Sequence, residues 1–204
     1  MTAVLVVGTM DTKGRECAYL ADRIRELGCE VVVMDVGILG EADEIRCDIT
    51  RRAVAEAAGT TLEALRHAGS RGKAVEGMRE GARRIARRLA GEARIHGAIS
   101  LGGAEGAVLA AAVMQELPLG LPKSIVSPIA SGRRTFGPFV GIADVSVTHS
   151  VVDILGLNTI ARTIYDTAAA GVAGAAHAYA RRPRDDEPVA GRRQVAATML
   201  GNTT

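Results

Sequence analysis

The chain has 204 residues, which fits one large domain, or one domain carrying a fragment of a second. Hydrophobic residues make up 48% of it, aromatic residues only 2%, and tryptophan is absent. The core must therefore be built from Ala, Val, Ile and Leu, which suits helices packed closely on a parallel sheet. The formal net charge of +2 is too small to indicate nucleic acid as a partner, and we expect none.

The basic residues are nearly all arginines, since Lys13, Lys73 and Lys123 are the only lysines. Many arginines lie in helical runs such as GARRIARRLAGEAR. Such a run most simply forms the solvated face of an amphipathic helix, and a basic docking surface is the alternative.

Cysteine usage and hydropathy indicate the cellular compartment. Cys17, Cys29 and Cys47 are odd in number and lack C-x-x-C spacing, which indicates free thiols in a reducing environment. The first residues, MTAVLVVGTM, read as a strand rather than a signal peptide, and no apolar run is long enough to cross a bilayer. We expect a cytoplasmic protein with no membrane partner.

The first third of the chain predicts a parallel crossover. Residues 3–7 form a β-branched run typical of a buried strand, residues 15–28 have helical periodicity ending at Gly28, and residues 30–37 form a second buried strand. A strand–loop–helix–strand unit of this kind predicts a right-handed connection between parallel strands.

A polar excursion over residues 38–49 leads to a short helix over 51–59, for which Asp48 or Thr50 is the expected cap. Thr60 and Glu63 have the spacing of a capping box for the next helix. An amphipathic helix is predicted from Lys73 to about Ala93. Its glycines, Gly77 and Gly81, cost helix stability, so we expect them to admit another backbone.

The remaining segments continue the α/β alternation. The pattern predicts strands over 97–101, 123–128 and 143–149, helices over 104–116 and 158–182, and a glycine-bearing loop over 129–141. We therefore expect an α/β fold over residues 1–181, Rossmann-like and doubly wound, with a mostly parallel sheet and helices on both faces.

The carboxyl-terminal segment changes in composition. Residues 182–193 combine charged residues with prolines and are interpreted as a linker. Residues 194–204, QVAATMLGNTT, resemble the start of the chain and are predicted to be the first strand and loop of a second, truncated α/β domain.

Three loops follow predicted strands at the edge where open parallel sheets bind ligands. Each offers glycines or hydroxyls, and the free N–H groups of a helix's first turn favour an anion. The candidate ligand-binding residues are Gly8, Thr9, Asp11, Thr12 and Lys13 in the first loop, Gly102, Gly103, Ala104, Glu105 and Gly106 in the second, and Ser127, Ser131 and Gly132 in the third. The alternative for the glycines is a structural turn.

The first loop carries the most chemistry. Thr9 and Thr12 offer hydroxyls to phosphate oxygens, and Lys13 offers a charge, unless it is only a surface cation. Asp11 is the candidate ligand of a hydrated magnesium ion, and the alternative is an amino-terminal helix cap.

Two common nucleotide motifs are missing. GTMDTKG lacks Walker A spacing and GGAEGA lacks the G-x-G-x-x-G fingerprint, so neither a standard NTPase nor an NAD dehydrogenase is supported. His149, near Ser150 and Asp153, is the one histidine near a predicted loop mouth. It is a candidate general base, and the alternative is a polar cap for the following helix.

Five motifs, VGTMDTKG, SLGGAEG, KSIVSPIASG, SVVDILGLNTIAR and TMLGNTT, resemble one family along essentially the whole chain. It is a bacterial and fungal family that includes the amino-terminal region of the tomato mosaic virus resistance protein, often labelled Tm-type ATP-binding. The resemblance implies two tandem Rossmann-like domains and ATP or a related nucleotide, with or without magnesium, at the first loop. It supplies no settled activity for bacterial members.

The second loop departs from the family pattern. Small hydroxyl residues are expected where this chain has Ala104, Glu105 and Ala107, and the Glu105 carboxylate would repel a phosphate unless Arg133 and Arg134 or a metal offset it. Our leading hypothesis is a domain that binds a nucleotide or another small phosphorylated ligand. The alternative is a scaffold module that forms a homo-oligomer, or docks a second α/β domain, through its small-residue helix over 168–180.

Overall fold

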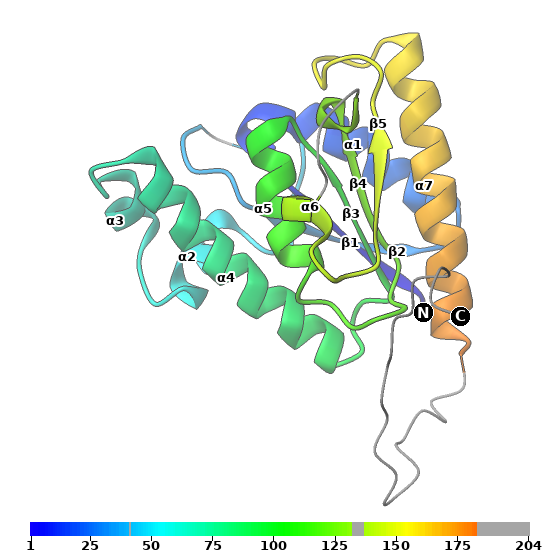
Figure 1. Ribbon diagram of the computed structural model, residues 1–204, viewed down its shortest axis with the longest axis horizontal. Coiled ribbons are helices and arrows are strands. Elements are labelled where there is room, and N and C mark those ends of the chain that lie inside the picture. The colour runs from blue at the N-terminus through cyan, green and yellow to red at the C-terminus, as the bar shows by residue number, and fades with distance from the viewer. Residues whose placement is uncertain (41, 132–136, 183–204) are drawn as a thin grey trace, which may run out of the picture.

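The structure is a computed structural model that describes residues 1–40, 42–131 and 137–182 (Figure 1). The predicted second unit over 194–204 and all but the first residue of the predicted linker lie outside the described residues. Gly132, Arg133 and Arg134 lie outside them too.

The described chain forms one five-stranded parallel sheet with the strand order β2-β1-β3-β4-β5. The predicted strands are confirmed, with the bounds β1 Ala3–Gly8, β2 Glu30–Asp35, β3 Gly97–Leu101, β4 Lys123–Ser127 and β5 Val145–His149. The central strands β1 and β3 are buried along their whole length, because helices cover both faces of the sheet.

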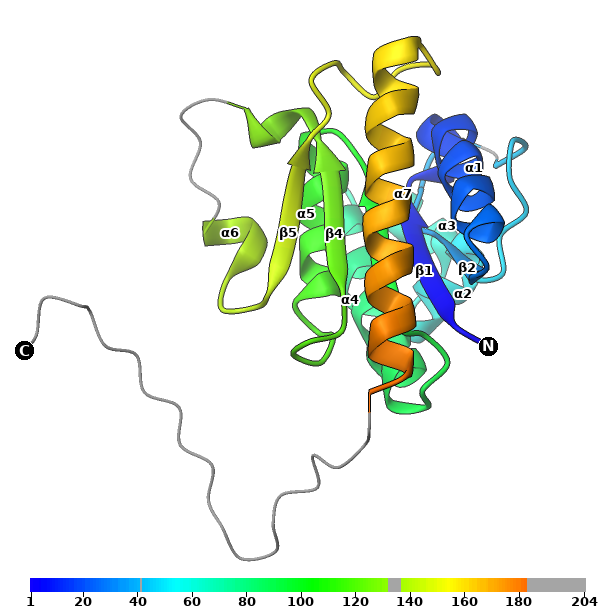
Figure 2. The ribbon, with the colours of Figure 1, turned by 90° about the vertical axis from the view of Figure 1, so that its right-hand side faces the viewer.

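Helices lie on both faces, so the predicted doubly wound, Rossmann-like fold is confirmed (Figures 1 and 2). Side chains alternate along β1: Leu5 and Val7 enter the core under α4 and α5, whereas Val4 and Val6 enter the core under α1 and α7. The helices are α1 Met10–Glu26, α2 Arg51–Ala57, α3 Leu62–Arg66, α4 Arg71–Gly91, α5 Ala104–Met114, α6 Gly137–Val140 and α7 Thr159–Ala180, with a 3-10 turn over Pro128–Ala130.

Of the two glycines inside α4, Gly81 admits the backbone of another helix, as expected, whereas Gly77 admits a side chain. A Cβ at Gly81 would lie 1.9 Å from the carbonyl oxygen of Val54 on α2, and one at Gly77 would lie 2.4 Å from Cδ2 of Leu65 on α3. The stability that these glycines cost α4 as an isolated helix is therefore offset by tight packing of α2 and α3 against it.

Two local predictions were wrong. The first helix begins at Met10, not after Gly14, so most of the presumed first loop is a helical turn with a kink at Lys13 (φ −129°, ψ 18°). The helix after α2 is capped by Thr61, whose Oγ1 accepts a hydrogen bond from the Ala64 N–H at 3.1 Å, and not by Thr60. At α2, Thr50 is the cap.

The direction in which successive strands are added to the sheet reverses between β1 and β3. Strand β2 lies on one side of β1, and β3, β4 and β5 follow on the other. At such a switch point the loops leaving two neighbouring strands turn to opposite faces and open a crevice. Those loops here are the starts of α1 and α5. Among the described helices, none is long and apolar enough to span a membrane.

Candidate functional site

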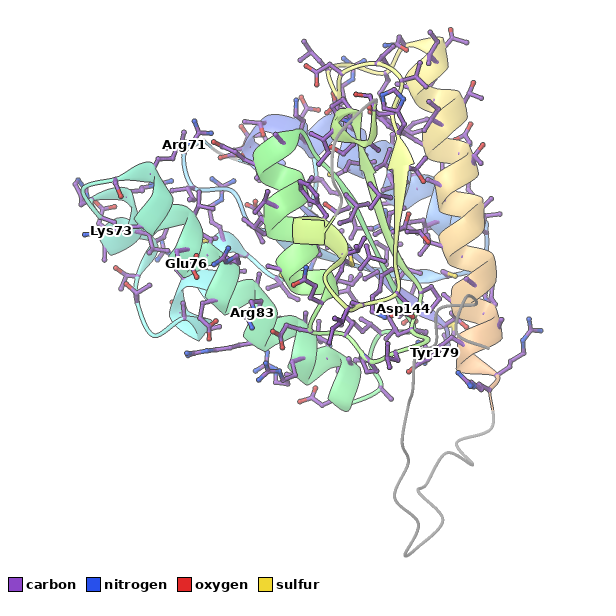
Figure 3. All side chains as sticks on the ribbon, viewed as in Figure 1. Arg71, Lys73, Glu76, Arg83, Asp144 and Tyr179 are labelled. Atoms are coloured by element: carbon purple, nitrogen blue, oxygen red, sulfur yellow. The ribbon has the colours of Figure 1, made fainter. Side chains whose placement is uncertain are left out.

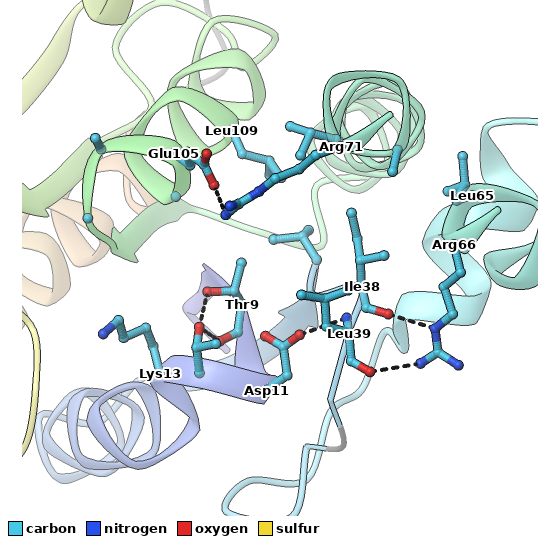
Figure 4. Close-up of a pocket in the computed structure, with 18 of the residues that line it drawn as sticks. Thr9, Asp11, Lys13, Ile38, Leu39, Leu65, Arg66, Arg71, Glu105 and Leu109 are labelled. Carbon is cyan, nitrogen blue, oxygen red and sulfur yellow. Dashed lines mark hydrogen bonds and ion pairs between the residues drawn. The ribbon is translucent and has the colours of Figure 1, made fainter. Parts of the chain in front are cut away.

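A pocket of about 610 Å³ opens at this switch point (Figure 4). Its walls come from the starts of α1 and α5, the loop after β2, and the facing ends of α3 and α4. Four residues of the first predicted loop (Thr9, Asp11, Thr12 and Lys13) and four of the second (Gly103, Ala104, Glu105 and Gly106) line it. The fold therefore brings two of the three predicted loops together.

Thr9 and Thr12 offer hydroxyls at the start of α1. Thr9 is the N-cap residue, but its side chain makes no capping bond; its Oγ1 lies 2.9 Å from Oγ1 of Thr12 instead. Thr12 Oγ1 also donates to the Thr9 carbonyl oxygen at 3.3 Å. Two hydroxyls therefore face each other in the pocket wall, where either can reorient toward a bound ligand.

Asp35, at the end of β2, takes over the capping of α1. Its Oδ1 accepts hydrogen bonds from the N–H groups of Met10 at 3.1 Å and Gly37 at 2.8 Å. Its Oδ2 accepts from Arg51 Nε at 2.7 Å. Both oxygens are thus engaged and the residue is buried, so Asp35 holds the first loop in place.

Gly8 precedes this capped turn and serves packing. A Cβ at this position would lie 2.8 Å from Sγ of Cys17 and 3.3 Å from Cε of Met10. Gly8 is not among the lining residues of the pocket. The close fit of α1 on β1 therefore explains why this position is a glycine.

Asp11 lines the pocket and fastens the loop after β2. Its Oδ2 accepts hydrogen bonds from the N–H groups of Leu39 at 3.0 Å and Gly40 at 3.2 Å. A Cβ at Gly37 would lie 2.7 Å from the Asp11 carboxylate, so glycine permits this close approach. Asp11 is therefore not a helix cap, the predicted alternative, because its carboxylate accepts hydrogen bonds from the separate loop after β2.

Lys13 also lines the pocket, but its ammonium group has a protein partner. Nζ donates to the carbonyl oxygen of Ile154, in the loop between β5 and α7. Three residues further along α1, Glu16 Oε1 accepts from the Gly156 N–H at 2.6 Å. Helix α1 therefore holds this loop beside the pocket through two side chains.

The glycines of the second loop divide into two roles. Gly102 is packed: a Cβ there would lie 3.0 Å from the backbone of Gly106. At Gly103 and Gly106, no atom of another described element lies within 4 Å of a Cβ position, and both residues line the pocket. Gly103 is the N-cap of α5 and has no side chain to occupy the helix's free N–H groups.

The first bond within α5 runs from the Ala107 N–H to the Gly103 carbonyl oxygen at 2.8 Å. The N–H groups of Ala104, Glu105 and Gly106 precede that bond, so the helix itself provides no acceptor for them. They lie in the pocket wall together with the positive end of the helix dipole.

Glu105 pairs with Arg71, the first residue of α4. Arg133 and Arg134, the expected partners, lie outside the described residues. Both members of the observed pair line the pocket and are largely exposed, and Figure 4 shows the pair reaching from α4 to the start of α5.

The opposite wall of the pocket, which includes Arg66, was not predicted from the sequence. Arg66 donates from Nε to the Ile38 carbonyl oxygen at 2.7 Å and so anchors the loop after β2. Around it the wall is apolar, with contributions from Val36, Ile38, Leu39, Leu65, Ala74, Val75 and Leu109. No local motif marks these residues, because they meet only when α3 and α4 fold over the sheet.

The described residues of the third predicted loop do not line this pocket. Ser127 is buried at the end of β4, where its Oγ accepts from the Ile129 N–H at 3.4 Å, and Ser131 is exposed. Neither lines the pocket, and neither does His149. Asn158 caps α7, so the predicted capping role of His149 is wrong.

Within residues 1–40, 42–131 and 137–182, no three His, Cys, Asp or Glu side chains lie close enough together to hold a metal ion. Asp11 is therefore the protein's candidate magnesium ligand only in combination with oxygens from a bound ligand, which is the manner in which magnesium commonly binds beside phosphates.

The fold and the pocket define an α/β domain of the doubly wound class, with a ligand-sized pocket at its topological switch point. The chain belongs to the family described as "Uncharacterised protein family (UPF0261) N-terminal domain", whose pattern matches residues 2–181. The predicted family resemblance is thereby confirmed.

Its relatives include bacterial and plant proteins. A UPF0261 protein of Clostridium tetani is 39% identical over 201 residues, covering 98% of this chain and 48% of the relative. A UPF0261 protein of Rhizobium meliloti is 36% identical, covering 100% of this chain and 48% of the relative. The tomato ToMV susceptible protein tm-1(GCR26) is 28% identical, covering 98% of this chain and 28% of the tomato protein. The chain spans about half the length of the bacterial relatives.

Proposed function

We propose that this domain binds a nucleotide such as ATP, or another small phosphorylated metabolite, in the pocket between the starts of α1 and α5. The observation that carries the proposal is the pair Gly103 and Gly106. Both line the pocket, and among the described residues no atom from another element lies within 4 Å of the point where a side chain would begin. Packing does not explain these glycines, whereas a phosphate approaching the α5 backbone would.

The two ends of the pocket suit the two parts of such a ligand. The polar end holds the free N–H groups of α5, the hydroxyls of Thr9 and Thr12, and the cation Lys13. The apolar end, lined by the loop after β2 and by α3 and α4, suits a flat or aliphatic group. The volume of about 610 Å³ is in the range of small-ligand sites.

A dinucleotide bound in the Rossmann manner is not part of this proposal. That manner needs a free carboxylate after the second strand to accept hydrogen bonds from a ribose. Asp35 has the corresponding position, but it is buried and both of its oxygens already accept protein hydrogen bonds. The proposed ligand is therefore a mononucleotide or a smaller phosphate compound.

Calorimetric titration with ATP, ADP and pyrophosphate at low salt, with and without magnesium, tests the proposal. A Gly106→Leu variant fills the pocket beside the α5 N–H groups and should abolish binding. Gly91→Leu is the matched control, because Gly91 is also helical with nothing within 4 Å of a Cβ, and it does not line the pocket. The absence of binding heat in the unaltered chain, or equal binding by both variants, contradicts the proposal.

A second candidate function is assembly, with or without a small ligand. It is favoured by the outward face of α7, where Ala170, Gly171, Gly174, Ala175 and Ala178 are all exposed. Small residues allow close helix contact with a second copy or a further domain. Light scattering on the chain with Gly171→Leu and Gly174→Leu tests this, since an unchanged mass would remove the support for a homo-oligomer through α7.

A further inference from the structure

The ion pair between Arg71 and Glu105 joins two elements across the candidate pocket. Arg71 begins α4 and Glu105 lies in the first turn of α5. Their side chains are 76% and 62% exposed, and within the described residues Glu105 is the acceptor that the Arg71 guanidinium contacts. An ion pair this exposed adds little stability, so it is easily exchanged for another partner.

The carboxylate lies where an anionic ligand is expected. Glu105 is the second residue of α5, beside the N–H groups that the proposed function assigns to a phosphate. It competes with an incoming anion in two ways: its charge offsets the positive end of the helix dipole, and it occupies Arg71, an arginine that lines the pocket. A phosphate can displace it, because a guanidinium binds phosphate oxygens in bidentate fashion.

We infer that Glu105 is a built-in competitor for the anionic ligand, and that Arg71 moves from Glu105 to the ligand's phosphate on binding. This inference rests on the proposed function. The exchange selects ligands by charge. A monoanion attracts the Arg71 guanidinium no more strongly than the Glu105 carboxylate does, whereas a diphosphate or triphosphate carries enough negative charge to displace Glu105. The pocket therefore favours polyphosphates over carboxylates and singly charged phosphate esters.

Titration of the whole chain with inorganic pyrophosphate at constant low ionic strength tests this. Glu105→Gln should tighten binding about fivefold, since it frees Arg71 and removes the competing charge. Glu76→Gln is the matched control: Glu76 pairs with Arg79 on the same helix as Arg71, outside the pocket, and changes the net charge equally (Figure 3). It should change the affinity less than about twofold.

A double-mutant cycle separates exchange from simple neutralisation. If Arg71 transfers to the ligand, Arg71→Gln should weaken pyrophosphate binding about tenfold in the Glu105→Gln background, where the guanidinium is free, and by a smaller factor in the unaltered chain, where the guanidinium must first leave Glu105. If Arg71→Gln has no effect once Glu105 is neutral, Arg71 only neutralises Glu105 and the inference is overturned. It is also overturned if Glu105→Gln leaves binding unchanged or weakens it.

These outcomes are distinguishable from failure of the proposed function. An unaltered chain that binds pyrophosphate or ATP, combined with a Glu105→Gln variant that binds no tighter, refutes the exchange alone. A chain that binds none of these compounds in any variant refutes both. Because both side chains are more than half exposed, the variants should fold, and their urea midpoints check this.

Discussion

Asp35 caps helix α1 from a different strand: its Oδ1 lies 3.1 Å from the backbone nitrogen of Met10 and accepts that N–H. The residue that precedes the helix, Thr9, makes no side-chain cap. The position of the first loop, and hence one wall of the pocket, therefore depends on a buried carboxylate 25 positions away in sequence.

Removing the charge of Asp35 should destabilise the whole domain. In Asp35→Asn, Arg51 loses its buried anionic partner, and breaking such a pair costs about 3–5 kcal/mol. Asp22→Asn, which disrupts an exposed pair with Arg25, should cost less than about 1 kcal/mol. Urea denaturation followed by circular dichroism gives both values, and a loss below about 1 kcal/mol in Asp35→Asn would show that the charge is dispensable.

Gly81 should tolerate no side chain. Alanine there would place its Cβ 1.9 Å from the Val54 carbonyl oxygen, so α2 and α4 would have to move apart, at a cost of about 1–3 kcal/mol or more. Alanine at Gly91, where nothing lies within 4 Å, should instead stabilise the helix by up to about 1 kcal/mol. Thermal unfolding should thus shift in opposite directions in the two variants, and equal shifts would contradict the packing described for α2 and α4.

Sequence patterns predicted the strands well because their causes are local. The β-branched runs at Ala3–Gly8 and Glu30–Asp35 give buried parallel strands wherever they pair. The amphipathic pattern of α4 predicted both ends of that helix to within two residues, and its two glycines correctly indicated close packing.

Errors arose where a distant group decides a local structure. No residue within GTMDTKG indicates that Asp35 accepts the Met10 N–H, so the early start of α1 could not be predicted from that segment. Thr60 and Thr61 are chemically alike and adjacent, so the residue types alone did not distinguish the cap, which is Thr61. In the candidate site, no sequence motif marks Arg66 or Arg71, and they enter the pocket because α3 and α4 pack over the sheet.

The Cys17 thiol should be inert in the folded protein. It is fully buried, and burial, together with the nearby Glu16 and Asp35, raises its pKa to about 12. Since the thiolate is the reactive form, iodoacetamide at pH 8 should label Cys17 only as fast as the protein unfolds.

Partial burial, together with the nearby Asp35, raises the pKa of the Cys47 thiol to about 11, so Cys47 should be labelled before Cys17 but still slowly. Peptide mass spectrometry of timed samples resolves the two sites. All three cysteines should react readily in concentrated urea, which is the control. Rapid labelling of Cys17 under native conditions would mean that α1 separates from β1 far more often than its packing suggests.

Stability should fall in acid partly through Asp144, at the end of the sheet opposite Arg71 (Figure 3). Partial burial acts to raise the Asp144 pKa, but hydrogen bonds from Lys123 Nζ and the Gly120 N–H outweigh it and hold the pKa below its ordinary value of 3.8. A carboxyl with a lowered pKa in the folded state stabilises above the ordinary value, and this contribution is lost as the pH falls through the lowered one.

Asp144→Asn should therefore cost about 1–3 kcal/mol at pH 6, because the Lys123 ammonium is buried and its other partners in the described part of the chain are the uncharged carbonyl oxygens of Pro118 and Leu121. At pH 3 the difference between the two proteins should shrink. Replacing both partners, as Lys123→Met with Asp144→Asn, should recover part of the loss and show the same weakened acid response. Urea titrations at both pH values measure this, and a difference that stays constant or grows toward pH 3 would show that the Asp144 charge does not carry the effect.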